Sequence, residues 1–282
     1  MYDALVIGGG PAGLQAALTL GRMHRTVVLV DSGRYRNSAA EHVHNFLTHD
    51  GRSSEELRKL AREELAGYAT VETRDATVQS MRETAEGFVA DGDDGPISAR
   101  TVVLATGMVD LLPDVPGLGE AWGAEVANCP FCHGHEFAER PVGVFGDGPH
   151  VDEVRSMLEP IASEVITFRH DDLVEVERAD GGLVAHRGPG DHVWLAGLFL
   201  HPGTKQAAPF AEQLGLELLP SGCVRIDALG RTNRPRVFAA GDLAHVEELP
   251  VPMPSLLAAA AAGLAAGSSA VRHLAASDPQ DV

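Results

Sequence analysis

The sequence predicts an α/β fold with two Rossmann-like domains, and three observations support this. The chain has 282 residues, of which 44% are hydrophobic, so it can bury the cores of two domains. A glycine-rich turn at residues 8–13 stands between a predicted strand and a predicted helix, and a second such turn at 146–151 stands in the same setting. Strands that alternate with helices favour parallel sheets covered by helices.

The first glycine-rich turn lies in the setting of a dinucleotide-binding fingerprint. A strand at 4–7 precedes it, a helical pattern follows to about Met23, and a second strand at 26–30 ends at Asp31. The fingerprint requires an acidic residue about 20 positions after the turn, and Asp31 fills that place. The pattern therefore predicts a dinucleotide site rather than a plain glycine-rich turn.

Each residue of this fingerprint has a physical role. Gly8 permits the tight turn, Gly10 lets the backbone approach a pyrophosphate, and Gly13 lets helix and strand pack closely. The carboxylate of Asp31 can accept a hydrogen bond from a ribose hydroxyl.

The rest of the chain continues the alternation. Ser53 and Glu56 form a capping-box pattern that predicts a helix to about Tyr68. The prolines and Gly117 within 112–117 indicate a domain crossing. Further strands are expected at 71–75, 101–105, 142–145, 165–168, 193–200 (as a pair), 224–227 and 237–240, with a short helix near residue 210 and an Ala-rich helix at 253–274.

The second glycine-rich turn departs from the fingerprint. Val151 occupies the position of the third small residue. After the strand at 165–168 come Arg169, His170 and Asp171, and the carboxylate of Asp171 would repel the 2′-phosphate of NADP. This half is therefore expected to be Rossmann-like without binding a nucleotide.

Two cysteines, Cys129 and Cys132, stand three positions apart and are followed by His133. Such a pair can close and reopen a disulfide and so move two electrons at once. The two cysteines alone also match half of a zinc site, and together with His133 they match the attachment pattern of c-type haem. The third cysteine, Cys223, stands alone and is expected to be inert packing.

Charge and composition exclude several classes of partner. The formal net charge of -18 argues against binding to nucleic acid or to an anionic membrane. The longest apolar run, at about 256–266, is too short to span a bilayer, and the first residues enter a strand without a signal-peptide pattern. We therefore expect a cytoplasmic protein, in which a close cysteine pair is catalytic rather than structural.

The order of these segments resembles the low-molecular-weight thioredoxin reductase family of flavoproteins. The resemblance implies a split FAD domain (1–112 and 226–282) around a trimmed NAD(P)-type domain (113–225) that bears the cysteines, both of them three-layer folds, and a homodimer. The matching pieces run over nearly the whole chain: Gly8-x-Gly10-x-x-Gly13, Ala105-Thr106-Gly107, Cys129-x-x-Cys132, Gly146-x-Gly148 and Phe238-Ala239-Ala240-Gly241-Asp242.

On this resemblance the Asp242 carboxylate holds the flavin ribityl chain, and no metal site is expected. The full set of cofactor-binding positions is Gly8, Gly10, Pro11, Ala12, Gly13, Asp31, Ser32, Asn45, Val78, Ala105, Thr106, Gly107, Gly241 and Asp242.

The departures from that family are specific. An acidic residue follows the second cysteine in the reductases, and here it is His133. Their basic pair for NADPH is reduced to Arg169 and His170, the segment 171–192 is much shorter, and the Arg-Gln pair after the Gly-Asp motif is missing. In these features the chain resembles the dithiol oxidases of natural-product pathways, of the holomycin and gliotoxin type.

That resemblance implies an enzyme that closes a disulfide within a small-molecule dithiol and passes the electrons through the cysteine pair and FAD to O2, giving H2O2. Cys129 would meet the substrate and Cys132 the flavin, with His133, or else His135, as the general base. The alternatives are a reductase driven by a pyridine nucleotide or a protein donor, a haem-binding electron carrier and a zinc-stabilised module.

Overall fold

The structure is a computed structural model that describes residues 1–278. The chain forms two compact units, each built from separate stretches. Unit 1 comprises Met1–Arg36, Glu55–Val109 and the chain from Thr204 onward, and unit 2 comprises Asn37–Ser54 and Asp110–Gly203.

The observed crossings differ in part from the predicted ones. The chain passes from unit 1 to unit 2 after Val109, near the predicted boundary at 112/113. It returns to unit 1 at 203/204, whereas the predicted boundary is at 225/226. Residues 204–225 join unit 1 because Phe210, Leu214 and Val224 are buried in its core. The stretch Asn37–Ser54, expected in the first segment of the FAD domain, belongs to unit 2.

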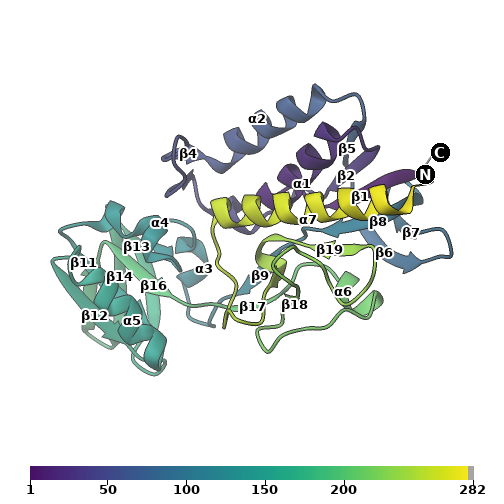
Figure 1. Cartoon of the computed structure of the whole chain (residues 1–282). Coiled ribbons are helices and arrows are strands. Elements are labelled where there is room, and N and C mark those ends of the chain that lie inside the picture. The colour runs from purple at the N-terminus through teal and green to yellow at the C-terminus, as the bar shows by residue number, and fades with distance from the viewer. Residues whose placement is uncertain (279–282) are drawn as a thin grey trace. The chain divides into compact units, whose positions relative to one another are not determined.

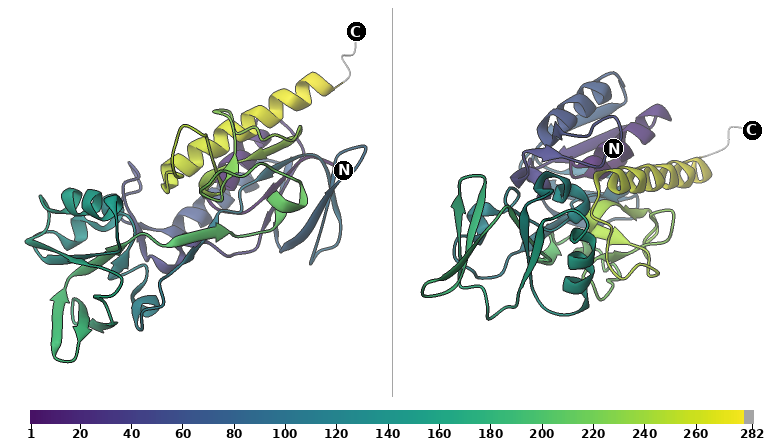
Figure 2. Two further views of the ribbon diagram at one scale, coloured as in Figure 1. Left: turned by 90° about the horizontal axis from the view of Figure 1, so that it is seen from below. Right: turned by 90° about the vertical axis from the view of Figure 1, so that its left-hand side faces the viewer.

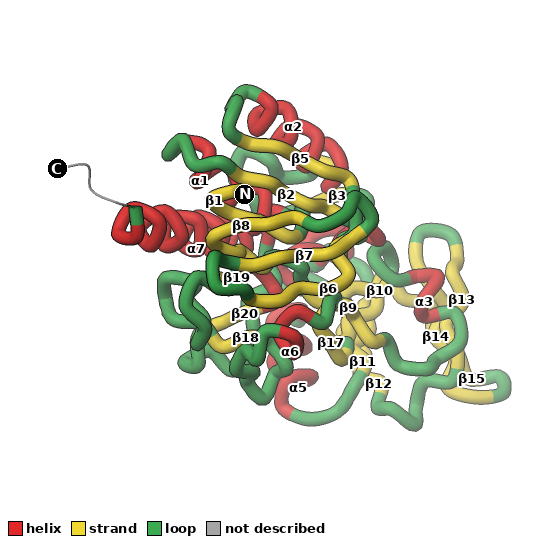
Figure 3. Tube along the Cα trace, turned by 90° about the vertical axis from the view of Figure 1, so that its right-hand side faces the viewer, coloured by secondary structure: helices red, strands yellow, loops and turns green. Residues whose placement is uncertain are grey.

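Unit 1 contains one seven-stranded sheet, in the order β5-β2-β1-β8-β7-β6 with β19 paired to β8 (Figure 3). Strands β5, β2, β1, β8 and β19 run parallel, and β7 and β6 extend β8 as an antiparallel meander. The bounds are β1 Tyr2–Ile7, α1 Pro11–Arg22, β2 Val27–Asp31, α2 Ser54–Ala66, β5 Val71–Asp75, β6 Val78–Glu83, β7 Phe88–Gly92, β8 Ile97–Leu104, α6 Phe210–Gln213, β18 Val224–Arg225, β19 Val237–Ala239, β20 Ala244–His245 and α7 Leu256–Ser277, with a short 3-10 helix η3 Gly241–Leu243. A second 3-10 helix, η1 Arg36–Ala39, begins at the last residue of the first stretch and continues into unit 2.

The sheet of unit 1 is buried on both faces. Along β1, Ala4 and Val6 pack with residues of α1, α2 and α7, whereas Leu5 and Ile7 pack with the meander and α6. Alternate residues of a strand point to opposite faces, so an all-apolar strand requires a layer on each side. Unit 1 is therefore a three-layer Rossmann-like domain, and the predicted fold class is confirmed.

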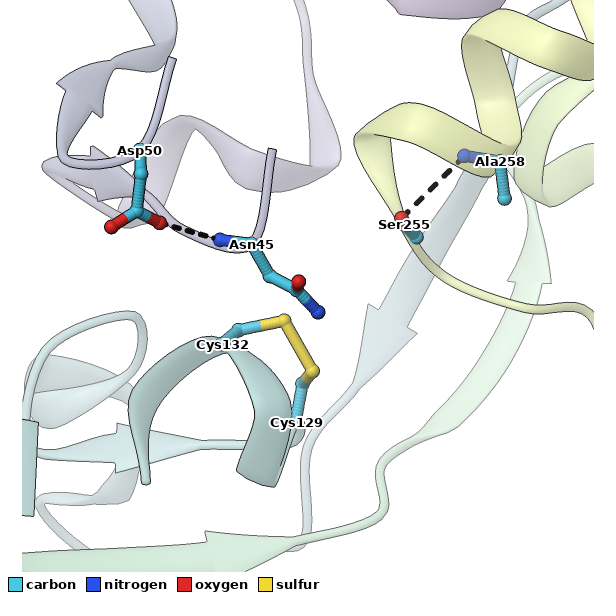
Figure 4. The surroundings of a disulfide bond; sticks show 6 residues. All are labelled: Asn45, Asp50, Cys129, Cys132, Ser255 and Ala258. Carbon is cyan, nitrogen blue, oxygen red and sulfur yellow. Dashed lines mark hydrogen bonds between the residues drawn. A yellow bond between two sulfur atoms is a disulfide. The ribbon is translucent and has the colours of Figure 1, made fainter. Parts of the chain in front are cut away.

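Helix α7 lies along α1 (Figure 1), and Figure 2 shows it as one unbroken helix. Small residues permit the close approach, because a Cβ added at Gly263 would stand 2.0 Å from the backbone oxygen of Ala12. The helix starts at Leu256 instead of the predicted residue 253, since prolines interrupt the chain just before it. The hydroxyl of Ser255 caps it by accepting from the N–H of Ala258 (Figure 4).

Unit 2 holds a four-stranded parallel sheet in the order β10-β16-β11-β12. Helix α5 packs on one face of this sheet, and the antiparallel sheet β13-β14-β15 with α3 packs on the other. The antiparallel sheet includes most of the segment 171–192, which is shorter here than in the thioredoxin reductases that the sequence resembles. The bounds are β3 His42–Val43, β4 Arg52–Ser53, α3 Leu118–Ala121, β10 Val126–Ala127, α4 Pro130–His133, η2 His135–Phe137, β11 Pro141–Phe145, α5 Pro149–Leu158, β12 Glu164–Phe168, β13 Glu175–Ala179, β14 Gly182–Gly188, β15 Asp191–Leu195 and β16 Gly197–Leu200.

The two crossings between the units, β9 Met108–Leu111 and β17 Gly203–Gln206, pair with each other as a two-stranded ribbon. None of the helices within residues 1–278 combines the length and the apolar character that a membrane-spanning segment needs.

Gly263→Ala is expected to destabilise unit 1 by about 1–3 kcal/mol, because the added methyl group overlaps the backbone of Ala12 and the two helices must move apart. Urea unfolding of the purified protein measures this. Gly119→Ala, in α3, is the matched control: its methyl group meets no atom within 4 Å, and alanine favours a helix over glycine. Equal unfolding midpoints for Gly263→Ala and the unchanged protein would contradict the prediction.

Candidate functional site

The cysteine pair lies where strand β10 leads into the short helix α4. Cys129 and Cys132 are joined by a disulfide, and both are partly exposed (Figure 4). Pro130 opens the helix, and the carbonyl of Cys129 accepts from the N–H of Cys132 at 3.1 Å and of His133 at 3.2 Å. This single turn holds the two sulfurs together, so the pair can store two electrons by opening and closing.

His133 ends helix α4, and its Nδ1 is buried without a hydrogen-bond partner. Burial lowers the pKa of His133; the negative charge of Glu136 opposes this shift, and His44 adds to it. A neutral imidazole that directly follows a disulfide cysteine in the chain is a candidate acceptor for the proton of a thiol. His135, the other candidate base, lies exposed in η2.

A loop from the stretch Asn37–Ser54 completes this part of unit 2. The side chain of Asn45 lies beside the disulfide in Figure 4. Its backbone has a φ of 60°, and its N–H donates to Oδ1 of Asp50 at 2.7 Å. The sequence predicts Asn45 as a cofactor ligand, and in the structure it belongs to unit 2 together with the cysteines.

His44 is a site residue that sequence reasoning missed. Its Nδ1 lies 3.6 Å from Oδ1 of Asp50, and its Nε2 lies 3.6 Å from Oε1 of Glu136. The available signal was the density of histidine and acidic residues in a loop that otherwise looked featureless.

In unit 1 the predicted dinucleotide turn has the geometry its glycines suggest. Gly8 has a φ of 111°, and a Cβ there would stand 2.2 Å from the carbonyl oxygen of Ala105. A Cβ at Gly13 would stand 1.8 Å from the oxygen of Gly8, whereas one at Gly10 would meet nothing within 4 Å. Helix α1 begins at Pro11 without a side-chain cap, so the N–H groups of its first turn face open space at Gly10 and can bind an anion.

Two other predicted segments meet this turn. Ala105 follows β8 directly beside Gly8, and Thr106 and Gly107 continue from it. On the other side, a Cβ at Gly241 would stand 3.0 Å from that of Ala12, so the turn that carries Asp242 lies against the start of α1.

The Asp242 carboxylate pairs with Arg36 at 2.7 Å, and both side chains are mostly buried. Behind this turn, the thiol of Cys223 donates to the Asp242 carbonyl at 3.5 Å. Cys223 is fully buried, and burial raises the pKa of its thiol, as expected for an inert packing residue.

Asp31 lies beneath the glycine-rich turn and is 2% exposed. Its carboxylate accepts from the Tyr35 hydroxyl at 2.5 Å, the Gly33 N–H at 3.0 Å and Arg62 at 2.5 Å. Burial alone would raise the pKa of Asp31, but these three donors outweigh it and lower the pKa. A carboxylate has about four acceptor positions, so one remains for a further donor such as a ribose hydroxyl.

The last two predicted positions both come after Asp31 in the chain. Ser32 follows it and is exposed, whereas Val78 is buried at the start of β6. The turn between β5 and β6 is tied to Asp31 by the N–H of Ala76, which donates to its carbonyl at 3.0 Å. In unit 1 the glycine-rich turn, Ala105 and the turn that carries Gly241 and Asp242 lie together, and the open space at Gly10 fits a dinucleotide such as FAD. The role of each predicted cofactor residue, Asn45 of unit 2 included, stays a prediction.

The second glycine-rich turn, in unit 2, contributes His150 and Val151 to the lining of a small pocket. The pocket lies where β11 and β16 end and the strand order reverses, which is where open α/β sheets bind nucleotides. The lining residues are Asn128, Val144, Phe145, His150, Val151, Val154, Phe199, Leu200 and His201.

Histidine rings and carboxylates occupy the rim of this pocket. The rings of His150 and His201 lie edge to face, with centroids 4.8 Å apart. Asp147 faces His170 at 3.8 Å, and Asp172 accepts from the backbone N–H of Arg169 at 3.1 Å. Carboxylates at the ends of β11 and β12 disfavour the phosphates of a pyridine nucleotide. Within residues 1–278, no three histidine, cysteine or acidic side chains gather in a way that could hold a metal ion.

Comparison with known proteins agrees with this arrangement. The family model described as pyridine nucleotide-disulphide oxidoreductase matches residues 2–167 and 149–263. The chain is 32% identical to a thioredoxin reductase, sirT, of Leptosphaeria maculans over 95% of its own length and 93% of that protein. It is 38% identical to a probable thioredoxin reductase of Arthroderma benhamiae, but this match covers 59% of the chain and 43% of that protein.

Among solved structures, an oxidoreductase from Agrobacterium tumefaciens aligns with a TM-score of 0.88 and 30% identity, over 98% of this chain and 99% of that one. The chain therefore belongs to the pyridine nucleotide-disulphide oxidoreductase family, as an FAD-dependent thiol/disulfide oxidoreductase similar to the thioredoxin reductases.

Proposed function

We propose that this enzyme is a dithiol oxidase, which closes a disulfide within a small-molecule dithiol and delivers the electrons to O2. The observation that carries the proposal is the chemistry of the second glycine-rich turn, in unit 2. Val151 stands where the third small residue of a nucleotide fingerprint belongs, and Asp147 and Asp172 place carboxylates at the ends of β11 and β12, where the phosphates of a nucleotide would lie. We propose that the electrons enter instead at the cysteine pair, from a dithiol.

The cysteine pair accepts those electrons by thiol–disulfide exchange. A substrate thiol gives its proton to His133, and the resulting thiolate attacks Cys129, so that a mixed disulfide forms as the Cys129–Cys132 bond breaks. The second substrate thiolate then attacks the mixed disulfide. The substrate leaves with an internal disulfide, and the enzyme keeps two electrons and two protons as a dithiol.

The glycine-rich turn of unit 1 would bind the FAD pyrophosphate at the start of α1, with Asp31 at the ribose and Asp242 at the ribityl chain. When bound, FAD supplies an acceptor for the electron pair and passes it to O2. The balance is one dithiol and one O2 to one disulfide and one H2O2. The partners are a small dithiol and O2, and we propose that the enzyme works as a homodimer.

An anaerobic titration of the yellow holoprotein tests the proposal. Dithiothreitol, NADPH and NADH are added separately, and the flavin absorbance is followed. We expect bleaching by the dithiol alone, and one H2O2 for each disulfide formed once O2 is admitted. Rapid bleaching by NADPH or NADH would contradict the proposal and favour a disulfide reductase. The intact Gly146-x-Gly148 turn is the feature of the sequence that supports this alternative.

A further inference from the structure

An aromatic side chain stands in solvent between the two cysteines. Phe131 belongs to the single turn of α4, and its side chain is 70% exposed. All nine phenylalanines of the chain lie within residues 1–278, and Phe131 is the only one of them that is exposed. Covering a phenyl ring removes a large apolar area from water, so this ring can contribute to the binding of whatever lies against it.

The local packing explains why this ring lies outside the core of unit 2. A Cβ added at Gly134 would stand 3.4 Å from Cδ2 of Leu158, so the buried side of the turn lies against α5. The next aromatic residue, Phe137 in η2, is buried in the core, where it meets the ring of Phe199 edge to face with centroids 5.8 Å apart. The segment therefore supplies the core with Phe137 and leaves Phe131 on the solvent side.

The covalent structure holds Phe131 at the reactive disulfide. Phe131 directly precedes Cys132, and the Cys129–Cys132 disulfide closes a loop of backbone that contains it. The Cys129 carbonyl also accepts from the N–H groups of Cys132 and His133 across the same turn. Both cysteines are partly exposed, so a molecule that bonds to Cys129 lies on the same single turn as the phenyl ring.

We propose that Phe131 is a specificity-determining residue that packs against the substrate and selects dithiols built on a planar, apolar ring over small polar ones. The proposal rests on the proposed function for the direction of the exchange. Two aromatic rings attract each other beyond the area they bury. Phe131 gains and loses no proton or electron, so its removal should slow a ring-bearing dithiol and spare a small polar one.

Two dithiols form a matched pair for this test. Both 1,2-bis(mercaptomethyl)benzene and dithiothreitol carry their thiols on CH2 groups, and both close cyclic disulfides of the same ring size. They differ in what the ring carries, a fused benzene ring in the first and two hydroxyl groups in the second. The ratio of their rate constants therefore reports recognition of the apolar ring, separately from the exchange chemistry.

The variants are chosen to separate the ring from the turn that carries it. Phe131→Ala removes the ring, and Phe131→Tyr keeps it. Val174→Ala is the matched control, because Val174 is also an apolar residue of unit 2 and is 53% exposed. Its N–H donates to the carbonyl of His186, in the antiparallel sheet on the face of unit 2 opposite α5.

The experiment measures how fast each dithiol opens the Cys129–Cys132 disulfide in the holoprotein without O2. Samples are quenched with an alkylating reagent, and the labelled cysteines are counted by mass spectrometry. In Phe131→Ala the ratio of the rate constants, aromatic dithiol over dithiothreitol, should fall by roughly threefold to tenfold. Dithiothreitol itself should react at nearly the rate of the unchanged protein, and Phe131→Tyr and Val174→Ala should keep the ratio.

An unchanged ratio in Phe131→Ala would overturn the proposal. Equal slowing with both dithiols would also overturn it, because the ring would then support the disulfide and not the substrate. If Phe131→Ala fails to fold or to retain its flavin, Phe131→Leu takes its place. Formation of H2O2 from dithiothreitol and O2 is measured separately on the unchanged protein. A shifted ratio without H2O2 would reject the proposed function alone, and H2O2 with an unchanged ratio would reject the role of Phe131 alone.

Discussion

Serine at either position of the cysteine pair is expected to stop dithiol oxidation. Cys129→Ser or Cys132→Ser removes one of the two sulfurs that close the disulfide, and a hydroxyl cannot take its place. Turnover should fall by at least roughly 10⁴-fold, the order seen when a covalent nucleophile is lost. Oxygen consumption with a small dithiol measures it.

Cys223→Ser serves as the control, because Cys223 lies buried in unit 1 outside the disulfide, and a serine keeps a donor for the Asp242 carbonyl. That variant should keep its activity. The two single variants also separate the roles of the pair. Cys132→Ser should capture a thiol from an aromatic disulfide as an adduct on Cys129, whereas Cys129→Ser should capture less. Rapid oxidation by either variant would show that the pair is not on the electron route.

His133→Ala is expected to slow dithiol oxidation by about 10²–10⁴-fold, the usual contribution of a placed general base. Burial lowers the pKa of His133 below the ordinary histidine value, which keeps the ring neutral around pH 7 and able to accept a proton. The rate with saturating dithiol at neutral pH measures the effect, and FAD should remain bound.

His135→Ala is the informative comparison, because His135 is exposed on the following turn. Its activity should stay within a few-fold of the unchanged protein. A large loss at His135 with little loss at His133 would assign the base to His135 instead.

Local patterns in the sequence predicted much of unit 1. The strand, glycine-rich turn and helix at 4–23 follow from apolar alternation and from glycines whose Cβ positions are occupied by backbone, at Gly8 and Gly13. The second boundary could not be found in this way. Residues 204–225 carry one short helix and several turns, and they join unit 1 through the packing of Phe210 and Leu214 against the meander, which no local signal reveals.

The candidate site shows the same division. Cys129, Cys132 and His133 stand together in the sequence, so their grouping needed no fold. His44 is more than 80 residues from them, and only the inclusion of Asn37–Ser54 in unit 2 brings its ring to Glu136. A sequence motif contains only residues that are close in the chain, so it could not reveal a residue that the fold brings close in space.

The packing of α7 on α1 has a consequence for synthesis on the ribosome. The apolar face of α1 emerges among the first residues to be translated, yet the glycines that cover it lie near residues 263 and 267. Unit 2 has its whole set of strands once residue 203 has left the exit tunnel, so it can mature first on the nascent chain. The nucleotide-binding unit must wait for release of nearly the entire polypeptide, and premature termination before α7 should yield chains that take up no flavin.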